Sequence, residues 1–380
     1  MKQNRIILYT LALLQGMVFY APVATLYRQA RGLTISQITM LEGMCLLLTL
    51  LCEFPWGVVA DRIGYRKTML FCNLCYLISK IIFWKAQGFG AFFVERILLA
   101  VVCAGLSGVD SSMLYLSCEE KKVQKAFSIH QYCGEVGLLF SAGFYAVFLS
   151  KRDNMAAFAT VLSYGIAFLL TFLLQEVREE EKEKNSSVGE IAALFPRLLK
   201  QKELLFLVIA VALFTEVEHT ITTFLNQMQY VHCGMGENLI SLIYIVMTLM
   251  GLLGIFSEKG SNMLGKRKFG MLLLMLAAIA CGGLIWTTSA ALSVGAILTL
   301  HICFCLFQPL QLKLQNDAVK TGNRATELSI NAVLIDGIGV GITVILGAAA
   351  DQGLSYAMAL GMGLCVLGLV MFCIGTKEEG

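Results

Sequence analysis

Residues 53–67 read EFPWGVVADRIGYRK, in which an apolar run passes abruptly into charged residues. Residues 254–268 read GIFSEKGSNMLGKRK and repeat that pattern. Each stretch has a glycine followed four positions later by an acidic and a basic residue, and then a glycine followed by a basic cluster. In the first stretch these residues are Gly57, Asp61, Arg62, Gly64, Arg66 and Lys67. We interpret the two stretches as equivalent points of an internal repeat, each at the end of an apolar helix.

A second pair of motifs supports the repeat. Ser128-Ile129-His130 is followed by Glu135, and Ser329-Ile330-Asn331 is followed by Asp336. The offset of 201 positions between these motifs equals the offset between Gly64 and Gly265. Because one offset relates motifs in different parts of the chain, the sequence predicts two homologous halves in parallel orientation.

The composition identifies the environment of these halves. Of the 380 residues, 57% are apolar and 14% are charged, and the mean hydropathy is +0.74. In a typical soluble domain about a quarter of the residues are charged. The low charged fraction of this chain therefore excludes a soluble multidomain enzyme and a secreted disulfide scaffold. A net charge of +3 is too small to indicate nucleic-acid binding.

The apolar segments predict twelve membrane-spanning helices. The run from Phe269 to Phe307 is too long for one helix and breaks at the polar tip Trp286–Ser289. We expect an all-α membrane protein with two pseudo-symmetric six-helix bundles, residues 1–175 and 204–380, joined by a cytoplasmic linker over 176–203. The expected spans are 5–27, 37–60, 68–86, 89–117, 125–149, 154–175, 204–231, 237–257, 268–287, 289–316, 326–350 and 353–375.

The basic residues predict the orientation of these spans. With a cytoplasmic N-terminus, 22 of the 29 Lys and Arg residues fall in inside segments, 6 fall in outside segments, and Lys80 lies within a span. Cytoplasmic loops carry such an excess of positive charge, so we expect both termini in the cytoplasm. The first apolar run has no small-residue cleavage site and is expected to be retained as a helix. The compact loops favour a bacterial inner membrane.

The stretch from Glu53 to Lys67 resembles the signature loop that the major facilitator superfamily carries between its second and third helices. The resemblance implies twelve helices and a conformational latch formed by Gly57, Asp61, Arg62, Gly64, Arg66 and Lys67, although these residues also suit a loop that only sets topology. Arg96, followed by small residues, is similar to the fourth helix of the drug-type members and extends the expected latch. Arg96 also suits an arginine that snorkels to the surface beside Glu95. The glycine–proline signature of the drug–proton antiporters is missing from the fifth helix.

Ionisable residues within the spans are functional candidates because a charge inside a bilayer is costly. Glu216, His219, Thr223 and Asn226 follow helical spacing and predict one polar stripe on the seventh helix. A carboxylate and an imidazole three positions apart can share a proton. We expect proton coupling from Glu216, His219, Glu135, Asp336 and Asp110. Glu218 falls on another face, and His301 is interpreted as a packing residue.

Further polar residues predict the lining of a substrate cavity. The resemblance implies that the first, fourth, seventh and tenth helices line it and that the fifth and eleventh join them. The expected lining consists of Gln15, Tyr20, His130, Gln131, Thr223, Asn226, Asn331, Gln308 and Gln311.

These features predict a secondary active transporter. The chain has no phosphate-binding loop of the G-x4-G-K-[ST] type, so we expect its energy to come from an ion gradient or from the substrate's own gradient. Carboxylates and a histidine within the spans favour protons as the coupled ion. An excess of buried acids favours efflux of an amphipathic or cationic compound, with uptake of a small metabolite as the alternative. A transporter-like receptor or scaffold and an integral membrane enzyme are the alternatives of other classes. We expect no catalytic residues, metal or cofactor, and a monomer whose partners are a small-molecule substrate, protons and the bilayer.

Overall fold

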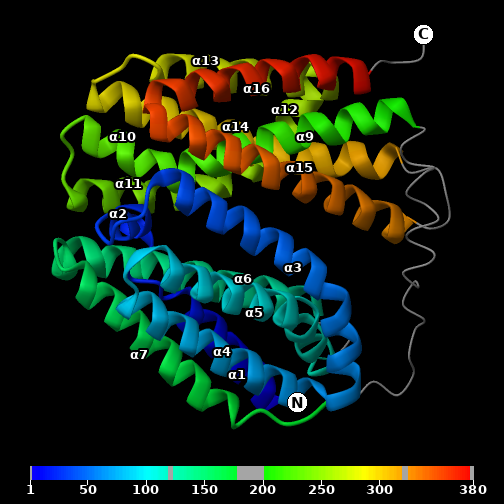
Figure 1. Cartoon of the computed structure of the whole chain (residues 1–380). Coiled ribbons are helices and arrows are strands. Elements are labelled where there is room, and N and C mark those ends of the chain that lie inside the picture. The colour runs from blue at the N-terminus through cyan, green and yellow to red at the C-terminus, as the bar shows by residue number, and fades with distance from the viewer. Residues whose placement is uncertain (1, 119–122, 178–200, 319–323, 377–380) are drawn as a thin grey trace. The chain divides into compact units, whose positions relative to one another are not determined.

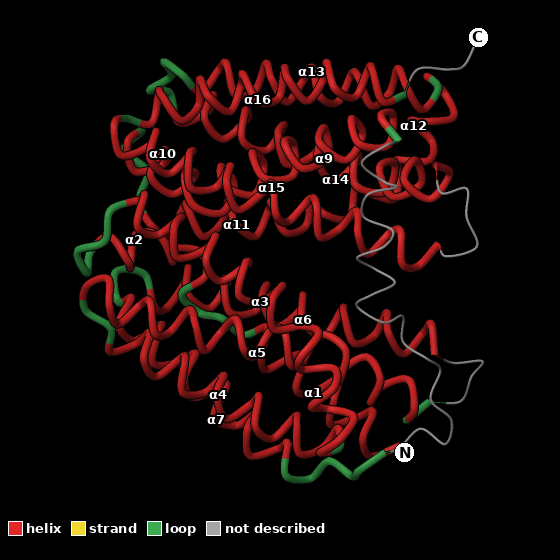
Figure 2. Tube along the Cα trace, turned by 45° about the vertical axis from the view of Figure 1, so that its right-hand side comes forward, coloured by secondary structure: helices red, strands yellow, loops and turns green. Residues whose placement is uncertain are grey.

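The computed structural model is all-helical over the residues that it describes, 2–118, 123–177, 201–318 and 324–376 (Figures 1 and 2). Twelve helical segments in this part of the chain are long and apolar enough to cross a membrane. The predicted fold class and number of spans are therefore confirmed. Most of the predicted linker, residues 178–200, lies outside the described residues.

The spans follow one another along the chain in this order. The first six comprise α1 (Lys2–Gly16) with η1 (Ala21–Val23) and α2 (Ala24–Gln29), α3 (Ile35–Ile63), α4 (Tyr65–Lys85), α5 (Gly88–Leu116), α6 (Val123–Phe144) with the π-helical η3 (Tyr145–Leu149), and α7 (Asp153–Thr171). The second six comprise α9 (Lys202–Thr220) with the π-helical η4 (Ile221–Leu225) and α10 (Asn226–His232), α11 (Glu237–Met250) with η5 (Gly251–Phe256) and α12 (Ser257–Leu264), α13 (Lys266–Leu284), α14 (Ala290–Ala318), α15 (Arg324–Gln352) and α16 (Leu354–Gly375).

Two details concern the predicted boundaries. The long apolar run splits as predicted, since α13 ends at Leu284, α14 begins at Ala290, and Trp286 between them is 86% exposed. The first span, predicted as one helix over 5–27, is interrupted after Gly16. Pro22 lies in the short 3-10 helix that follows, and a proline cannot donate the hydrogen bond that an α-helix interior requires.

The two halves of the repeat also have equivalent helix starts and equivalent side-chain hydrogen bonds. Tyr65 and Lys266, which begin α4 and α13, are 201 positions apart. Each follows a glycine with a positive φ, +93° at Gly64 and +81° at Gly265. Equivalent arginines then bond equivalent carbonyls: Arg66 Nη2 lies 3.0 Å from Phe172 O, and Arg267 Nη2 lies 3.3 Å from Cys373 O.

Contacts between Cα atoms divide the chain into two compact units. Unit 1 contains residues 1–33, 44–182 and 236–245, and unit 2 contains 34–43, 183–235 and 246–380. In unit 1, α1 packs on α6 and α7, and α4 packs on α5 and α7. In unit 2, α9 packs on α15 and α16, and α13 packs on α14 and α16. The same pairs of equivalent helices are thus in contact in both units.

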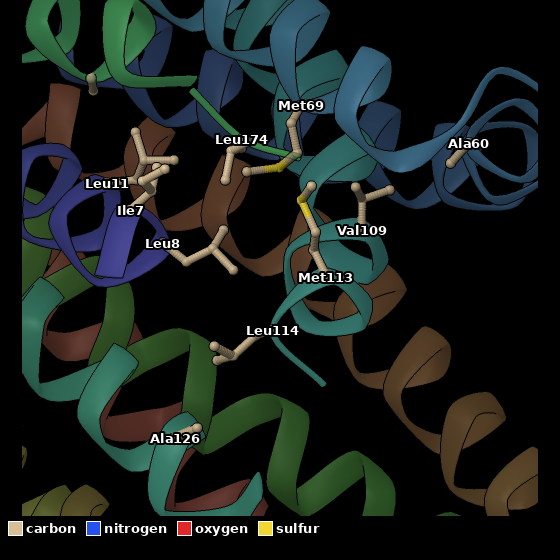
Figure 3. Packing of buried hydrophobic residues seen from close by; sticks show 11 residues of the cluster. Ile7, Leu8, Leu11, Ala60, Met69, Val109, Met113, Leu114, Ala126 and Leu174 are labelled. Atoms are coloured by element: carbon tan, nitrogen blue, oxygen red, sulfur yellow. The ribbon is translucent and has the colours of Figure 1, made fainter. Parts of the chain in front are cut away.

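Small and apolar side chains hold unit 1 together. A buried cluster joins α1, α3, α4, α5, α6 and α7 through Ile7, Leu8, Leu11, Ala60, Met69, Val109, Met113, Leu114, Ala126, Ala167 and Leu174 (Figure 3). The backbones of α1 and α6 approach closely, because a Cβ atom on Gly137 would overlap the carbonyl oxygen of Leu13. Small residues permit such close contacts between membrane helices.

Candidate functional site

Glu216 on α9 is the centre of a buried hydrogen-bond network in unit 2. Glu216 as a whole residue is 7% exposed. Oε1 accepts hydrogen bonds from the hydroxyl of Thr220, at 3.3 Å, and from the hydroxyl of Thr343 on α15. His219 Nδ1 lies 3.4 Å from the same oxygen. The carboxylate therefore has two hydroxyl donors and one imidazole neighbour.

The rest of the predicted stripe on this span does not continue along one face. Residues Ile221–Leu225 form a π-helical turn, which contains more residues per turn than an α-helix. Thr223 is exposed, whereas Asn226 is 3% exposed and its Oδ1 accepts the backbone N–H of Gln227 at 2.7 Å. Because the π turn changes the rotation of the chain, the regular spacing from Glu216 no longer places Asn226 beside Thr223.

A second acid–imidazole pair in unit 2 joins α9 to α14. Glu218 Oε1 lies 2.8 Å from His301 Nδ1 and accepts the Thr222 hydroxyl at 3.0 Å. His301 Nε2 lies 3.5 Å from Cys305 Sγ. The side chains of Glu218 and His301 are 5% and 20% exposed. Sequence reasoning missed this pair; the signal available was two isolated ionisable residues in otherwise apolar helices, each of which needs a partner.

Unit 1 brings together two predicted candidates from different helices. His130 Nε2 on α6 lies 3.2 Å from Asp110 Oδ2 on α5. The next residue on α6, Gln131, donates through Nε2 to Oε1 of Glu135, one turn further along the helix, at 3.3 Å. Asp110, predicted for proton coupling, and His130, predicted for the cavity, thus form one ion pair when the imidazole is protonated.

Two other predicted cavity residues in unit 1 take part in packing. Gln15 Nε2 donates to Asn73 Oδ1 at 2.6 Å. Tyr20 is 5% exposed and stacks on Phe83 with 4.0 Å between ring centroids. The Tyr20 hydroxyl lies 3.2 Å from Lys80 Nζ, so this lysine is buried among aromatic rings in place of reaching a membrane surface.

Buried amides in unit 2 leave polar atoms without hydrogen-bond partners. Asn331 on α15 is 1% exposed, and neither its Oδ1 nor its Nδ2 has a partner among the described residues. The same holds for Gln311 Oε1 and Gln315 Nε2 on α14. Of the other predicted residues, Gln308 is exposed and Asp336 is half-buried. Unpaired buried amides are costly, so a water molecule or a ligand would bind favourably to them.

The expected latch is described in part. The surroundings of Gly57 and of the Asp61 side chain are not among the described features, and the side chains of Arg62 and Lys67 are exposed. The backbone N–H of Arg66 donates to Glu176 Oε1 at 3.4 Å. Arg96 Nε lies 3.4 Å from Glu95 Oε2. Within unit 1, the basic loop is thus connected to the segment that follows α7.

Comparisons with known proteins place this geometry in a family. The family model described as Major Facilitator Superfamily matches residues 6–344. The crystal structure of the nucleoside transporter NupG superposes with a TM-score of 0.83 at 14% identity, covering 99% of this chain and 100% of that one. A bacterial homolog of the human lysosomal transporter Spinster, inward-facing and occupied, gives 0.76 at 15% identity, with 99% and 96% covered. The D-xylose–proton symporter gives 0.71 at 13% identity, with 99% and 97% covered. This multi-pass integral membrane protein therefore belongs to the Major Facilitator Superfamily, a family of transporters rather than enzymes.

Proposed function

We propose that this protein is a proton-coupled secondary transporter in which Glu216 carries the coupled proton. The observation that carries the proposal is the buried Glu216 carboxylate, surrounded by two hydroxyl donors and an imidazole. These neighbours can bond to the ionised form and also to the neutral form, since a hydroxyl group donates or accepts. Glu216 can therefore gain and lose a proton while it stays buried.

The bond between Glu216 and Thr343 supplies a route from protonation to conformation. It joins α9 to α15, and a hydrogen bond to an ionised acceptor is about twice as strong as one to a neutral acceptor. Protonation of Glu216 therefore weakens one link between these helices. A change in that link shifts the population of the states that the transporter alternates between.

The polar inventory favours a small neutral solute with hydroxyl or amide groups. Among the described residues, Asp110, Glu135, Glu216 and Glu218 each already bond a neighbouring side chain. The buried groups without a hydrogen-bond partner include, among the described residues, the amides of Gln311, Gln315 and Asn331 on α14 and α15, which bond neutral donors and acceptors. Fold neighbours whose names specify a nucleoside and D-xylose support this class.

Efflux of an amphipathic or cationic compound is the second candidate. The acids within the spans, Asp110, Glu135, Glu216, Glu218 and Asp336, outnumber Lys80 and Arg96. Arg96 and the small residues after it also resemble the drug-type branch. If these carboxylates leave their present hydrogen-bond partners and bind the substrate, their excess negative charge favours a cationic substrate.

We further propose the arrangement in the membrane that the sequence predicts. Both termini face the cytoplasm, the halves 1–175 and 204–380 are joined by the linker over 176–203, and the protein works as a monomer. The loop around Arg66 acts as a latch. The support is the asymmetry of basic residues and the contact of Arg66 with Glu176.

Transport in proteoliposomes tests the proposal. A panel of nucleosides, pentoses and cationic dyes is presented with and without a pH gradient, and uphill transport is compared with substrate exchange. We expect Glu216→Gln to abolish pH-driven accumulation or efflux and to retain exchange. Asp317→Asn, at a carboxylate of unit 2 that is 52% exposed, is the matched control and should change neither.

Two results contradict the assignment. If Glu216→Gln retains full pH-driven transport at normal expression, this residue does not carry the proton. If the variant also loses exchange, Glu216 contacts substrate instead. Failure of every panel compound under every gradient would contradict the proposed substrate classes.

A further inference from the structure

Tyr145 in η3 lies between two carboxylates in unit 1. Its hydroxyl oxygen lies 2.6 Å from Asp153 Oδ1, at the start of α7, and 3.0 Å from Glu237 Oε2, at the start of α11. Glu237 also accepts the backbone N–H of Lys151 at 2.6 Å through Oε2. We name Tyr145, Asp153 and Glu237 the Tyr145 cluster.

A count of hydrogens fixes the protonation of this cluster. A phenol has one hydrogen to donate, and an ionised carboxylate only accepts. Tyr145 can therefore bond both acids only when one of them holds a proton. Glu237 Oε2 already accepts from Lys151, so it suits the ionised form. Asp153 then carries the proton and donates to Tyr145, and Tyr145 donates to Glu237.

The neighbouring cation does not substitute for this proton. Besides the Tyr27 phenol on α2, the ionisable group outside the cluster that faces Asp153 is Arg31, in the segment after α2. Its guanidinium group donates to Asn154 Oδ1 at 3.1 Å and to the carbonyls of Ala86 and Trp84. Arg31 offsets part of the negative charge from a distance, but the bond between Asp153 and Tyr145 still needs a hydrogen.

We propose that the Tyr145 cluster is a proton-binding site that holds the start of α11 against η3 and α7 only when it is protonated. Loss of the proton leaves two carboxylates around one phenol and removes one hydrogen bond. The backbone conformation of Lys151 is a second reason why the start of α11 separates from η3 when the proton is lost. Lys151 has a φ of +62°, a conformation that costs about 1–2 kcal/mol for a residue with a side chain.

The repeat contains a counterpart that needs no additional proton. The segment Thr34–Gly43 of unit 2 is equivalent to Gly236–Ile245 of unit 1, 202 positions later. There Asp351 Oδ1 accepts the backbone N–H groups of Ile35 and Ser36 at 3.0 and 3.2 Å. Backbone N–H groups keep their hydrogen at working pH, so these two hydrogen bonds form without an additional proton on Asp351. The site is independent of Glu216, and so is its test.

Hydrogen–deuterium exchange of the substrate-free protein in lipid nanodiscs tests the proposal, because exchange reports local opening. The observable is the protection factor of the Lys151 amide and the first turn of α11, corrected for the intrinsic exchange rate. Between about pH 5 and about pH 9, above the usual pKa of a carboxyl group and below that of a phenol, we expect protection to fall on deprotonation of the cluster. The expected fall is about tenfold or more, as for loss of a hydrogen bond to a charged group.

Three variants give the test its controls. Glu237→Gln and Asp153→Asn each replace an acid by an amide that supplies its own hydrogens, so protection should be independent of pH in both. Asp351→Asn should lower protection of the Ile35 and Ser36 amides at every pH and leave the pH dependence at Lys151 unchanged. A wild-type protection factor that is constant with pH overturns the proposal. So does an unchanged pH dependence in either amide variant, and two amide variants allow for one that does not fold.

Discussion

The pair formed by Glu218 and His301 leads to a quantitative prediction. Replacing His301 by Leu leaves a 5% exposed carboxylate with Thr222 as its remaining hydroxyl donor. Breaking one side of a buried ion pair costs about 3–5 kcal/mol. We expect a value near the low end, about 3 kcal/mol, because Thr222 remains and His301 is itself 20% exposed.

The complementary change costs less. Glu218→Gln keeps a side-chain oxygen that can accept from Thr222, and it removes the buried charge. The expected loss is about 1 kcal/mol, the value of one hydrogen bond. The double variant has neither charge nor imidazole and should lose about 2 kcal/mol, so the two residues are coupled by about 2 kcal/mol in a double-mutant cycle.

Equilibrium unfolding in mixed micelles, with increasing denaturing detergent and circular dichroism as the readout, measures the four free energies of this cycle. Lys266 and Asp317 provide the matched control, since their ion pair is 2.7 Å long but 43% and 52% exposed. The control pair should show coupling below about 1 kcal/mol. A coupling energy below about 0.5 kcal/mol between Glu218 and His301 would contradict the prediction, because residues in direct contact normally show a larger value.

Further predictions concern packing, the latch and topology. Gly137→Val should destabilise the protein by forcing α1 and α6 apart. Gly143→Val, at a position with open space for a Cβ atom, should not. Thermal denaturation followed by size-exclusion chromatography measures the stability of both variants. Asp61→Asn and Gly57→Leu should slow transport more than they weaken substrate binding, and equal losses in purified protein would argue against a latch. A single cysteine within 178–200 should resist an impermeant thiol reagent in intact cells, and labelling there would contradict the proposed orientation.

Twelve spans and their repeat could be predicted because their signals are local. A span is a run of apolar residues long enough to cross a bilayer, and the break at Trp286 is visible as a polar interruption of such a run. The positive φ values at Gly64 and Gly265 accompany two glycines that a sequence offset had already paired. None of these features requires knowledge of which helices are neighbours.

For the candidate site, the sequence could predict the important residues but not their partners. Residue types and their positions in apolar runs are enough to show which side chains are costly in a membrane, and Glu216, Asp110 and His130 were selected on that ground. Their partners could not be predicted in this way, because a partner depends on how each helix is rotated and on which helix it packs against. Asp110 therefore meets His130 on another helix, and Glu218 meets His301 eighty-three positions away. A π turn, which follows no hydrophobic period, then removes Asn226 from the predicted stripe.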